Sequence, residues 1–319
     1  MIALVEDAPG ATRALVLDGE RVVEAHFARA DDPLPLGLIA LGRLTSRAGG
    51  RGQVVIAGHD ALIEQVPADW PEGQTRIMEV VRPARPDGVR DKQARVVVHP
   101  GPARPAPDLA ARLAAAGHDV RQVAAFGADA LADAGWDAVV EEALTGRIDF
   151  RGGRLLVAMT PAMLVIDVDG DGDLLRLAEG AAQAVAALIR RHAIGGPVVI
   201  DFPSLQGKAQ RAAVDSILAE QLPAPFEKTA INGFGLVQII RPRRHLSLFE
   251  QVRQPGFAAL ELLRRASRLA GNTTITAGPR TIDWLAARPH LIDDAARRCG
   301  GRVALVAAEG QGRGHVQQG

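Results

Sequence analysis

The sequence predicts a mixed α/β chain, of the α+β kind with several subdomains, and three patterns carry that prediction. Two apolar strands, Leu164–Asp167 and Val198–Asp201, enclose one amphipathic helix, as in a parallel strand–helix–strand unit. Short strand-like runs separated by turn residues fill the first 81 positions, which is typical of antiparallel sheets and barrels. Helices and strands alternate again beyond residue 250. The 319 residues, 47% of them apolar, suffice for more than one hydrophobic core.

The central helix is predicted over 173–192 because its apolar residues recur with helical spacing. These residues are Leu174, Leu177, Ala178, Ala181, Val185, Leu188 and Ile189. Asp173 has the side chain of an N-cap, and Gly195-Gly196 stops the helix. The two strands of such a unit end at the same edge of the sheet, so Asp167 and Asp201 are expected to lie together. Two carboxylates at one edge suit a divalent cation.

The acidic stretch Asp167–Asp173 also invites comparison with a calcium-binding EF-hand loop. Position 12 of that loop should be Glu, but Ala178 occupies it, and a strand precedes the loop where a helix is required. We therefore interpret Asp171 and Asp173 as an acidic turn that caps the following helix. Asp167 and Asp201 differ, because each continues a buried apolar strand where a charge needs a partner such as a cation.

An ordered series of motifs resembles the catalytic subdomain of the ribonuclease E/G family. The series begins with Ile166-Asp167-Val168-Asp169 and ends with Phe234-Gly235-Leu236-Val237 followed by Arg241 and Arg243. Between them lie Arg191-His192-Ala193-Ile194-Gly195-Gly196, Val198-Val199-Ile200-Asp201-Phe202 and Gln210-Arg211-Ala212. The series spans roughly a third of the chain, so it is far more specific than a single motif.

This resemblance implies a metal-dependent endoribonuclease. In the family the two strand-end aspartates bind the catalytic Mg²⁺, which maps onto Asp167 and Asp201, with Mn²⁺ as an alternative ion. The polar residue two positions after the first aspartate, here Asp169, helps to orient it or serves as an outer or third ligand. A water on the ion would attack the phosphorus of single-stranded RNA, while Arg241 or Arg243 would offset the developing charge.

The chain also departs from the family pattern. Gly233 stands where the family has an arginine, and Pro203 where it has a further acidic residue. The segment Gln251–Phe257 lacks the paired cysteines that share a zinc ion between family subunits. We therefore expect no structural zinc, and any homodimer through the small domain would form without a shared zinc. The rival hypotheses are a catalytically weakened RNA-binding relative and an interaction protein built on the same fold.

The resemblance extends to a map of the whole chain. Residues 1–36 and 96–147 are expected to form a ribonuclease-H-like support, and 37–95 a reduced S1-type barrel inserted into it. Residues 148–250 would be the nuclease-like α/β catalytic subdomain, 257–308 a small α/β domain and 309–319 a flexible tail. The segment that senses a 5′ monophosphate in larger members is expected to be deleted between Val98 and Pro107. The strand Val96–Pro100 would then begin the second part of the support.

RNA binding is expected to depend on local charge, because the formal net charge is zero. The clearest basic cluster is Arg241, Arg243, Arg244 and His245, and a second one near the barrel is Arg82, Arg85, Arg90 and Lys92. Either cluster could contact phosphates, and the alternative for each is a solvated strand end. Base stacking on the barrel should be weak, because Val54 and Leu62 stand where the family has aromatic residues.

The composition points to a cytoplasmic protein without a membrane partner. No apolar run reaches membrane-spanning length, and Glu6 and Asp7 argue against a signal peptide. The one cysteine, Cys299, permits no internal disulfide and is expected to be a small buried residue.

Overall fold

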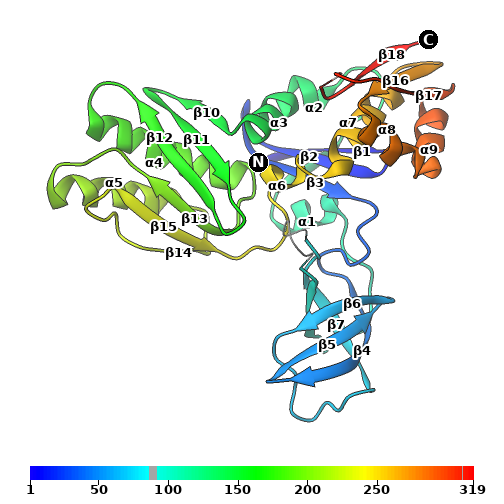
Figure 1. The fold of residues 1–319 in the computed structure, drawn as a ribbon, viewed down its shortest axis with the longest axis horizontal. Helices are drawn as coiled ribbons and strands as arrows, with labels where there is room; N and C mark the ends of the chain where they lie inside the picture. Colours follow the sequence, from blue (N-terminus) through cyan, green and yellow to red (C-terminus); the bar gives the residue numbers. More distant parts are fainter. Residues whose placement is uncertain (86–91, 311) are drawn as a thin grey trace.

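Three open sheets and one closed barrel organise the part of the chain that the computed structural model describes, residues 1–85, 92–310 and 312–319. Figure 1 shows the barrel projecting away from the sheets, with the largest sheet and the C-terminal elements on opposite sides of the N-terminal strands. The mixed α/β class predicted from the sequence is therefore confirmed, with a closed barrel of five strands.

The first sheet joins the N-terminus to a segment more than a hundred residues later in the chain. It has the order β3-β2-β1-β9. Its elements are β1 (Ile2–Ala8), β2 (Ala11–Asp18), β3 (Arg21–Arg29) and β9 (Asp119–Gln122), with α1 (Leu109–Ala115) packed against it. Hairpin turns at Gly10 and Gly19, both with positive φ, connect the first three strands. β9 pairs with β1 in parallel. Chain segments that precede and follow the barrel in the sequence therefore share one sheet.

The barrel has the closed strand order β4-β5-β6-β8-β7. Its strands are β4 (Ile39–Ala48), β5 (Arg51–Ile56), β6 (His59–Ile63), β7 (Thr75–Arg82) and β8 (Ala94–Val98). The expected boundary at residue 95 is wrong, because β8 pairs with β6 and β7 and closes the barrel. Val54 is fully buried in the barrel core beside Trp70 and Met78, so it is not a surface position that an aromatic ring could use for stacking.

The largest sheet has six strands in the order β10-β11-β12-β13-β15-β14. Its strands are β10 (Arg147–Phe150), β11 (Gly153–Met159), β12 (Leu164–Gly170), β13 (Gly196–Asp201), β14 (Glu227–Lys228) and β15 (Leu236–Arg241). The helices of this region are α2 (Ala130–Asp133), α3 (Trp136–Thr145), α4 (Leu174–Arg191) and α5 (Gly207–Gln221). α4 packs against β10, β11, β12 and α5. Asp173 caps α4 as predicted, because its Oδ1 accepts a hydrogen bond of 2.9 Å from the amide of Arg176.

The C-terminal elements surround a sheet with the order β17-β16-β18. They are α6 (Leu248–Gln251), α7 (Pro255–Arg268), β16 (Thr273–Ala277), α8 (Pro279–Ala286), α9 (Pro289–Cys299), β17 (Val303–Ala307) and β18 (His315–Gln318). The segment 309–319, expected to be a flexible tail, contains the last strand, since β18 pairs antiparallel with β16. Cys299 is buried, as predicted. Among the helices just described, none has the length and apolar character needed to cross a membrane.

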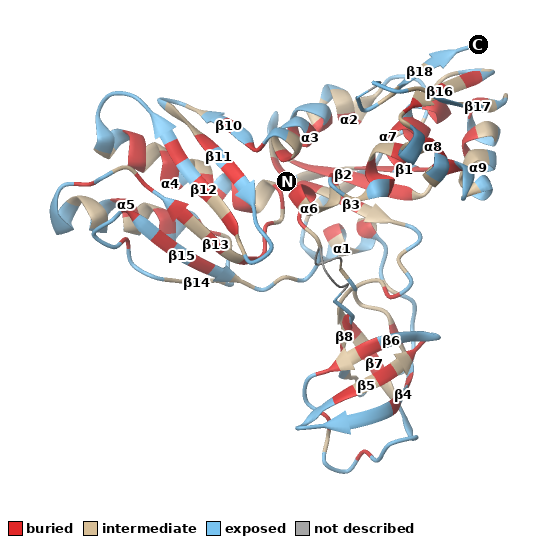
Figure 2. Ribbon diagram, viewed as in Figure 1, coloured by how far each residue is buried: buried red, intermediate tan, exposed pale blue. Residues whose placement is uncertain are grey.

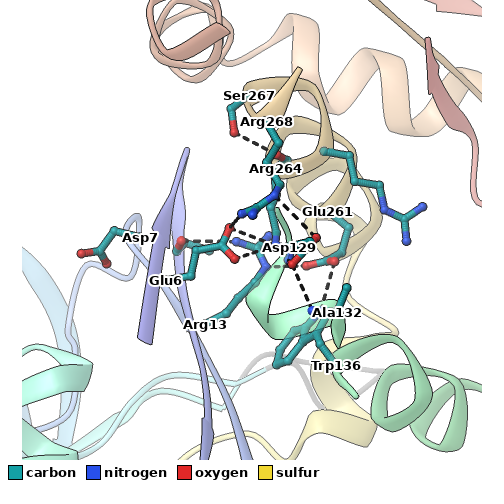
Figure 3. Close-up of polar contacts among 12 residues, drawn as sticks. Glu6, Asp7, Arg13, Asp129, Ala132, Trp136, Glu261, Arg264, Ser267 and Arg268 are labelled. Atoms are coloured by element: carbon teal, nitrogen blue, oxygen red, sulfur yellow. Dashed lines mark hydrogen bonds and ion pairs between the residues drawn. The ribbon is translucent and has the colours of Figure 1, made fainter. Parts of the chain in front are cut away.

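A buried network of ion pairs fastens α7 to the first sheet (Figure 3). Arg264 contacts Glu6 of β1 at 3.0 Å and also pairs with Asp129, while Arg13 of β2 donates to Glu261 at 2.5 Å. The Trp136 indole donates to the second oxygen of Glu261 at 3.2 Å. Because Glu6, Arg13 and Arg264 are almost fully buried, each needs its partner to offset the loss of hydration. The network therefore fixes the C-terminal elements against the N-terminal strands.

Candidate active site

Asp167, in the middle of β12, and Asp201, at the end of β13, lie side by side on neighbouring parallel strands. The predicted strand end at Asp167 is wrong, because the β11–β12 ladder continues to Gly170. In the β12–β13 ladder, Asp167 is the direct partner of Asp201, as Ile166 is of Ile200. The two isoleucines are buried under the helices, and because side chains alternate along a strand, the two aspartates lie on the opposite face. Figure 2 shows this alternation of buried and exposed residues along the strands of the large sheet. The sequence prediction that these carboxylates meet is thus confirmed by the strand register.

The aspartate pair belongs to a row of five exposed residues that crosses the sheet. Leu156 of β11 pairs with Asp167 and with Arg147 of β10, and Leu236 of β15 pairs with Asp201. The row therefore reads Arg147, Leu156, Asp167, Asp201, Leu236. The two leucines that flank the pair are large apolar side chains that are 36% and 37% exposed. The pair thus sits on an open sheet face with an apolar residue on each side.

Neither carboxylate of the pair has a charged or hydrogen-bonding partner among the residues that the structure describes. Like charges on directly opposed residues destabilise a sheet, which a cation between them would relieve. The described residues contain no group of three or more His, Cys, Asp or Glu side chains suited to hold a metal. Mg²⁺ fits a site made of two carboxylates, because it is often held by one or two carboxylates and keeps its remaining ligands as water or phosphate oxygens.

Asp169 lies one pleat further along β12, on the same face as Asp167 but opposite Arg154 of β11. The pKa of Arg154 is raised mainly by its hydrogen bond to Asp149, with a smaller contribution from the charge of Asp169. Asp169 is therefore flanked by a cation, unlike the pair beside it. This arrangement separates its role from that of Asp167 and Asp201, and Arg154 is the cation that the strand register places closest to the pair.

The expectation that Arg241 or Arg243 offsets charge at the aspartates is wrong. Arg241 pairs with Gly196 at the start of β13, whereas Asp201 is at the end of that strand. Five residues of strand separate the two positions by about 16 Å. The Arg241 side chain instead donates to the carbonyl oxygens of Pro223 and Ile194, and burial lowers its pKa. Its first role is therefore to satisfy backbone groups at the far end of the sheet.

The other predicted RNA-binding residues lie near that far end or on the barrel. Arg243 donates to the carbonyl of Gly195 at 3.2 Å and faces Glu250 at 3.7 Å. Arg244 is exposed and lines a cavity of about 410 Å³ together with His26, Arg190 and His245. This cavity lies at the end of the sheet remote from the aspartate pair.

Lys92 is exposed, and its backbone forms an isolated antiparallel β-bridge with that of Arg85. Arg90 of the same predicted cluster lies outside the described residues. The pKa of Arg82 is lowered by burial and by neighbouring positive charges, among them that of Arg243. Arg82 of the barrel therefore lies within electrostatic reach of Arg243, although the two residues are far apart in the sequence. Local sequence patterns contain no signal for this proximity.

Phe234 is a residue whose position the sequence did not reveal. The motif Phe234-Gly235 was expected from the family resemblance, but no pattern indicated that the ring is 85% exposed. Gly235 has φ +86°, and a Cβ there would lie 2.3 Å from the carbonyl oxygen of Phe202 and 3.7 Å from Oδ1 of Asp201. The turn that carries Phe234 is therefore packed directly beside the aspartate pair.

Part of the sequence is similar to proteins of a known family. Residues 118–244 match the model of the ribonuclease E/G family. Ribonuclease G of Salmonella typhimurium (strain SL1344) is 30% identical over 122 residues, which are 34% of this chain and 25% of that protein. Ribonuclease G of Haemophilus influenzae (strain ATCC 51907 / DSM 11121 / KW20 / Rd) is 29% identical over 127 residues, 36% of this chain and 26% of that protein. The match thus spans about a quarter of the length of these relatives.

Proposed function

Residues 118–244 belong to the ribonuclease E/G family, and from this premise we propose that the chain is a Mg²⁺-dependent endoribonuclease that cleaves single-stranded RNA. The observation that supports the proposal is the direct pairing of Asp167 with Asp201 on an open sheet face, as two carboxylates without a charged partner among the described residues. The function would be RNA processing or decay, and the pair would hold the ion, with Mn²⁺ as an alternative.

The roles of the residues follow from their positions. When bound, the ion would supply an activated water and neutralise charge on the phosphate. Asp167 and Asp201 would hold it on the open sheet face, and Asp169, whose strand partner is Arg154, would orient groups around it. The open face admits an extended unpaired strand, whose bases remain free to contact the protein. Arg243, Arg244 and Lys92 would contact phosphates farther along the strand, with Arg241 supporting the backbone beneath them.

A specific observation favours the rival proposal of a catalytically weakened RNA-binding relative. Gly233 occupies the position where the family has an arginine, and a Cβ added there would have no neighbour within 4 Å. Arg241 and Arg243 lie at the other end of the sheet, so they do not replace the missing cation. The rival therefore expects the same RNA to bind with little or no cleavage. A homodimer through the small domain, without shared zinc, is compatible with both proposals.

Cleavage of a labelled AU-rich single strand, with Mg²⁺ and with chelator, tests the proposed activity. We expect Asp167→Asn and Asp201→Asn each to lower the rate roughly a thousandfold, since losing one anionic ligand costs about 4 kcal/mol of transition-state stabilisation. Asp171→Asn is the matched control, because Asp171 is an exposed acid that directly follows β12 and lies outside the pair.

Wild-type-like cleavage by both pair mutants would contradict the assignment of the site. Cleavage absent from the wild type itself, with RNA binding retained, would favour the weakened relative. Circular dichroism on each variant checks that the fold persists.

A further inference from the structure

The exposed Phe234 lies in a turn whose backbone is fixed by several hydrogen bonds. Oδ1 of Asn232 accepts hydrogen bonds from the amides of Phe234 and Leu236 at 2.9 and 3.1 Å. The carbonyl of Asn232 accepts from Gly235 at 3.2 Å, and the amide of Phe202 donates to Gly235 at 3.1 Å. These bonds fix the turn without using the phenyl ring. The ring is therefore held in a defined place and contributes little to the folded core.

An aromatic ring in such a position is unusual for this chain. The chain has eight phenylalanines. Phe126, which is 71% exposed, is the other phenylalanine whose side chain the described structure leaves largely in solvent. Phe126 lies in the segment between β9 and α2, outside the large sheet. Exposing a phenyl ring forgoes the free energy of burying it, about 1.5 to 3 kcal/mol. A ring kept in water on a rigid turn is therefore a candidate contact for a ligand.

The surroundings of the ring indicate which ligand it suits. Leu236, two residues later, pairs with Asp201, and Leu156 extends the same row on the other side of the aspartate pair. A cation held by the pair would attract phosphate oxygens to the centre of this row. A nucleotide carries a flat ring attached through its sugar to a phosphate, so a phosphate at the pair leaves its base near the apolar and aromatic surface. Duplex RNA could not use this surface, because its bases are stacked on one another.

We propose that Phe234 is a base-stacking contact of the substrate site, receiving an unpaired nucleobase whose phosphate lies at Asp167 and Asp201, with Leu236 beneath it. This inference rests on the proposed function and adds to it the residue that grips a base. It also moves base recognition from the barrel, where Val54 is buried, to the sheet that carries the aspartates. Every base has a flat face, so the contact is tolerant of sequence but selective for unpaired strands.

The test measures binding rather than cleavage, in protein that keeps both aspartates, with Ca²⁺ in place of Mg²⁺ so that the pair can hold a cation while turnover is suppressed. A short unpaired RNA is compared with versions that carry one abasic site at successive positions. We expect Phe234→Ala to weaken binding of the intact RNA roughly 5-fold to 150-fold, the range for one lost base–aromatic stack. Phe234→Trp should restore it. At one RNA position, replacing the nucleotide by an abasic site should weaken binding to the parent protein, which keeps Phe234. The same replacement should not weaken binding to Phe234→Ala.

Phe126→Ala is the matched control, an exposed phenylalanine away from the sheet, and should bind as the parent does. Equal affinity of Phe234→Ala and the parent would overturn the inference. A loss that is the same for intact and abasic RNA would also overturn it, since it would indicate a contact with a protein surface or a general defect. Failure of wild-type protein to cleave RNA would count against the proposed function alone, because this binding measurement needs no turnover.

Discussion

Glu24 of β3 is a single carboxylate that ties the first sheet to the large one. Its Oε1 accepts two hydrogen bonds from Arg190 near the end of α4, at 2.9 and 3.0 Å, and its Oε2 contacts His26 at 3.0 Å. Burial by itself would raise the pKa of Glu24. The hydrogen bonds and charges of His26 and Arg190 outweigh burial and lower the pKa to about 2. The ionised carboxylate therefore stabilises the contact between β3 and α4.

The pH dependence of unfolding should reveal this contribution. A carboxylate whose pKa is lower in the folded state stabilises the protein above its unfolded pKa, and loses that effect as the pH falls toward its folded pKa. We expect Glu24→Gln to reduce the free energy of unfolding by about 1 to 2 kcal/mol above pH 5, an estimate that allows for solvent screening. The difference from wild type should shrink as the pH falls from about 4.3 toward 2.

Urea unfolding at several pH values measures this difference, and Glu20→Gln, an exposed turn residue, is the control. A deficit in Glu24→Gln that stayed constant down to pH 2 would show that the carboxylate charge is not the cause.

Among the elements, α7 depends on the N-terminal strands for the partners of its charges. Arg264 is 1% exposed and Glu6 is fully buried, so removing either one would leave the charge of the other buried with fewer compensating partners. Arg268 of the same helix also forms an ion pair with Glu6, at 3.2 Å. The charge of Glu6 is therefore compensated by arginines from two successive turns of α7. Opposite charges lie on elements far apart in the chain. The network therefore specifies how α7 docks on β1 and β2.

Removing one partner of this network should destabilise the protein strongly. We expect Arg264→Met to lower the free energy of unfolding by about 3 to 5 kcal/mol, because Glu6 would keep a buried charge with poorer compensation. The neighbouring Arg265→Met is the control; its guanidinium is half exposed and 3.6 Å from Asp137, so its loss should cost less than about 1 kcal/mol.

The double variant Glu6→Leu with Arg264→Met should recover part of the loss, since it removes both charges. Denaturant unfolding provides all of these values. A double variant less stable than the sum of the two single losses would argue against charge isolation as the cause.

Across the whole molecule, a formal net charge of zero means that affinity for a polyanion must come from the arrangement of charges. The charge of Arg243 at the strand end reaches Arg82 of the barrel, so these two positive charges influence one another. Arg244, in the same cluster as Arg243, is exposed, and no ion pair reaches it from the described part of the chain. It is the side chain of the cluster most available to a phosphate.

The salt dependence of RNA binding should therefore respond to Arg244. In the Asp167→Asn background, Arg244→Ala should weaken binding to all unpaired sequences alike and lower the slope of log affinity against log salt by about 0.7. Arg280→Ala, an exposed arginine of α8, is the control. Arg241→Ala should instead reduce stability, because its guanidinium satisfies two backbone carbonyls. An unchanged slope in Arg244→Ala would mean that the cluster is only a solvated strand end.

Local sequence patterns were sufficient for the strand–helix–strand unit of β12, α4 and β13 and for the aspartate pair of the candidate site, but they did not indicate β10, β11 or β14. The helical spacing of apolar residues placed α4, and its cap at Asp173 was predicted correctly. Because the two strands of a parallel strand–helix–strand unit end at the same edge, the meeting of Asp167 and Asp201 followed from the order of the elements alone. These features depend on backbone periodicity and on short-range connections, which the sequence of a segment encodes directly.

Contacts between distant segments were decided only by the tertiary structure. The antiparallel direction of β15 puts Leu236 beside Asp201 and carries Arg241 to the other end of the sheet, which reversed the expected role of that arginine. The pairing of β8 with β6 closed the barrel beyond its predicted boundary, and the exposure of Phe234 depends on which surfaces the rest of the chain leaves uncovered. Strand direction, ladder partners and solvent exposure arise from the free energy of packing the whole chain, so no single segment contains them.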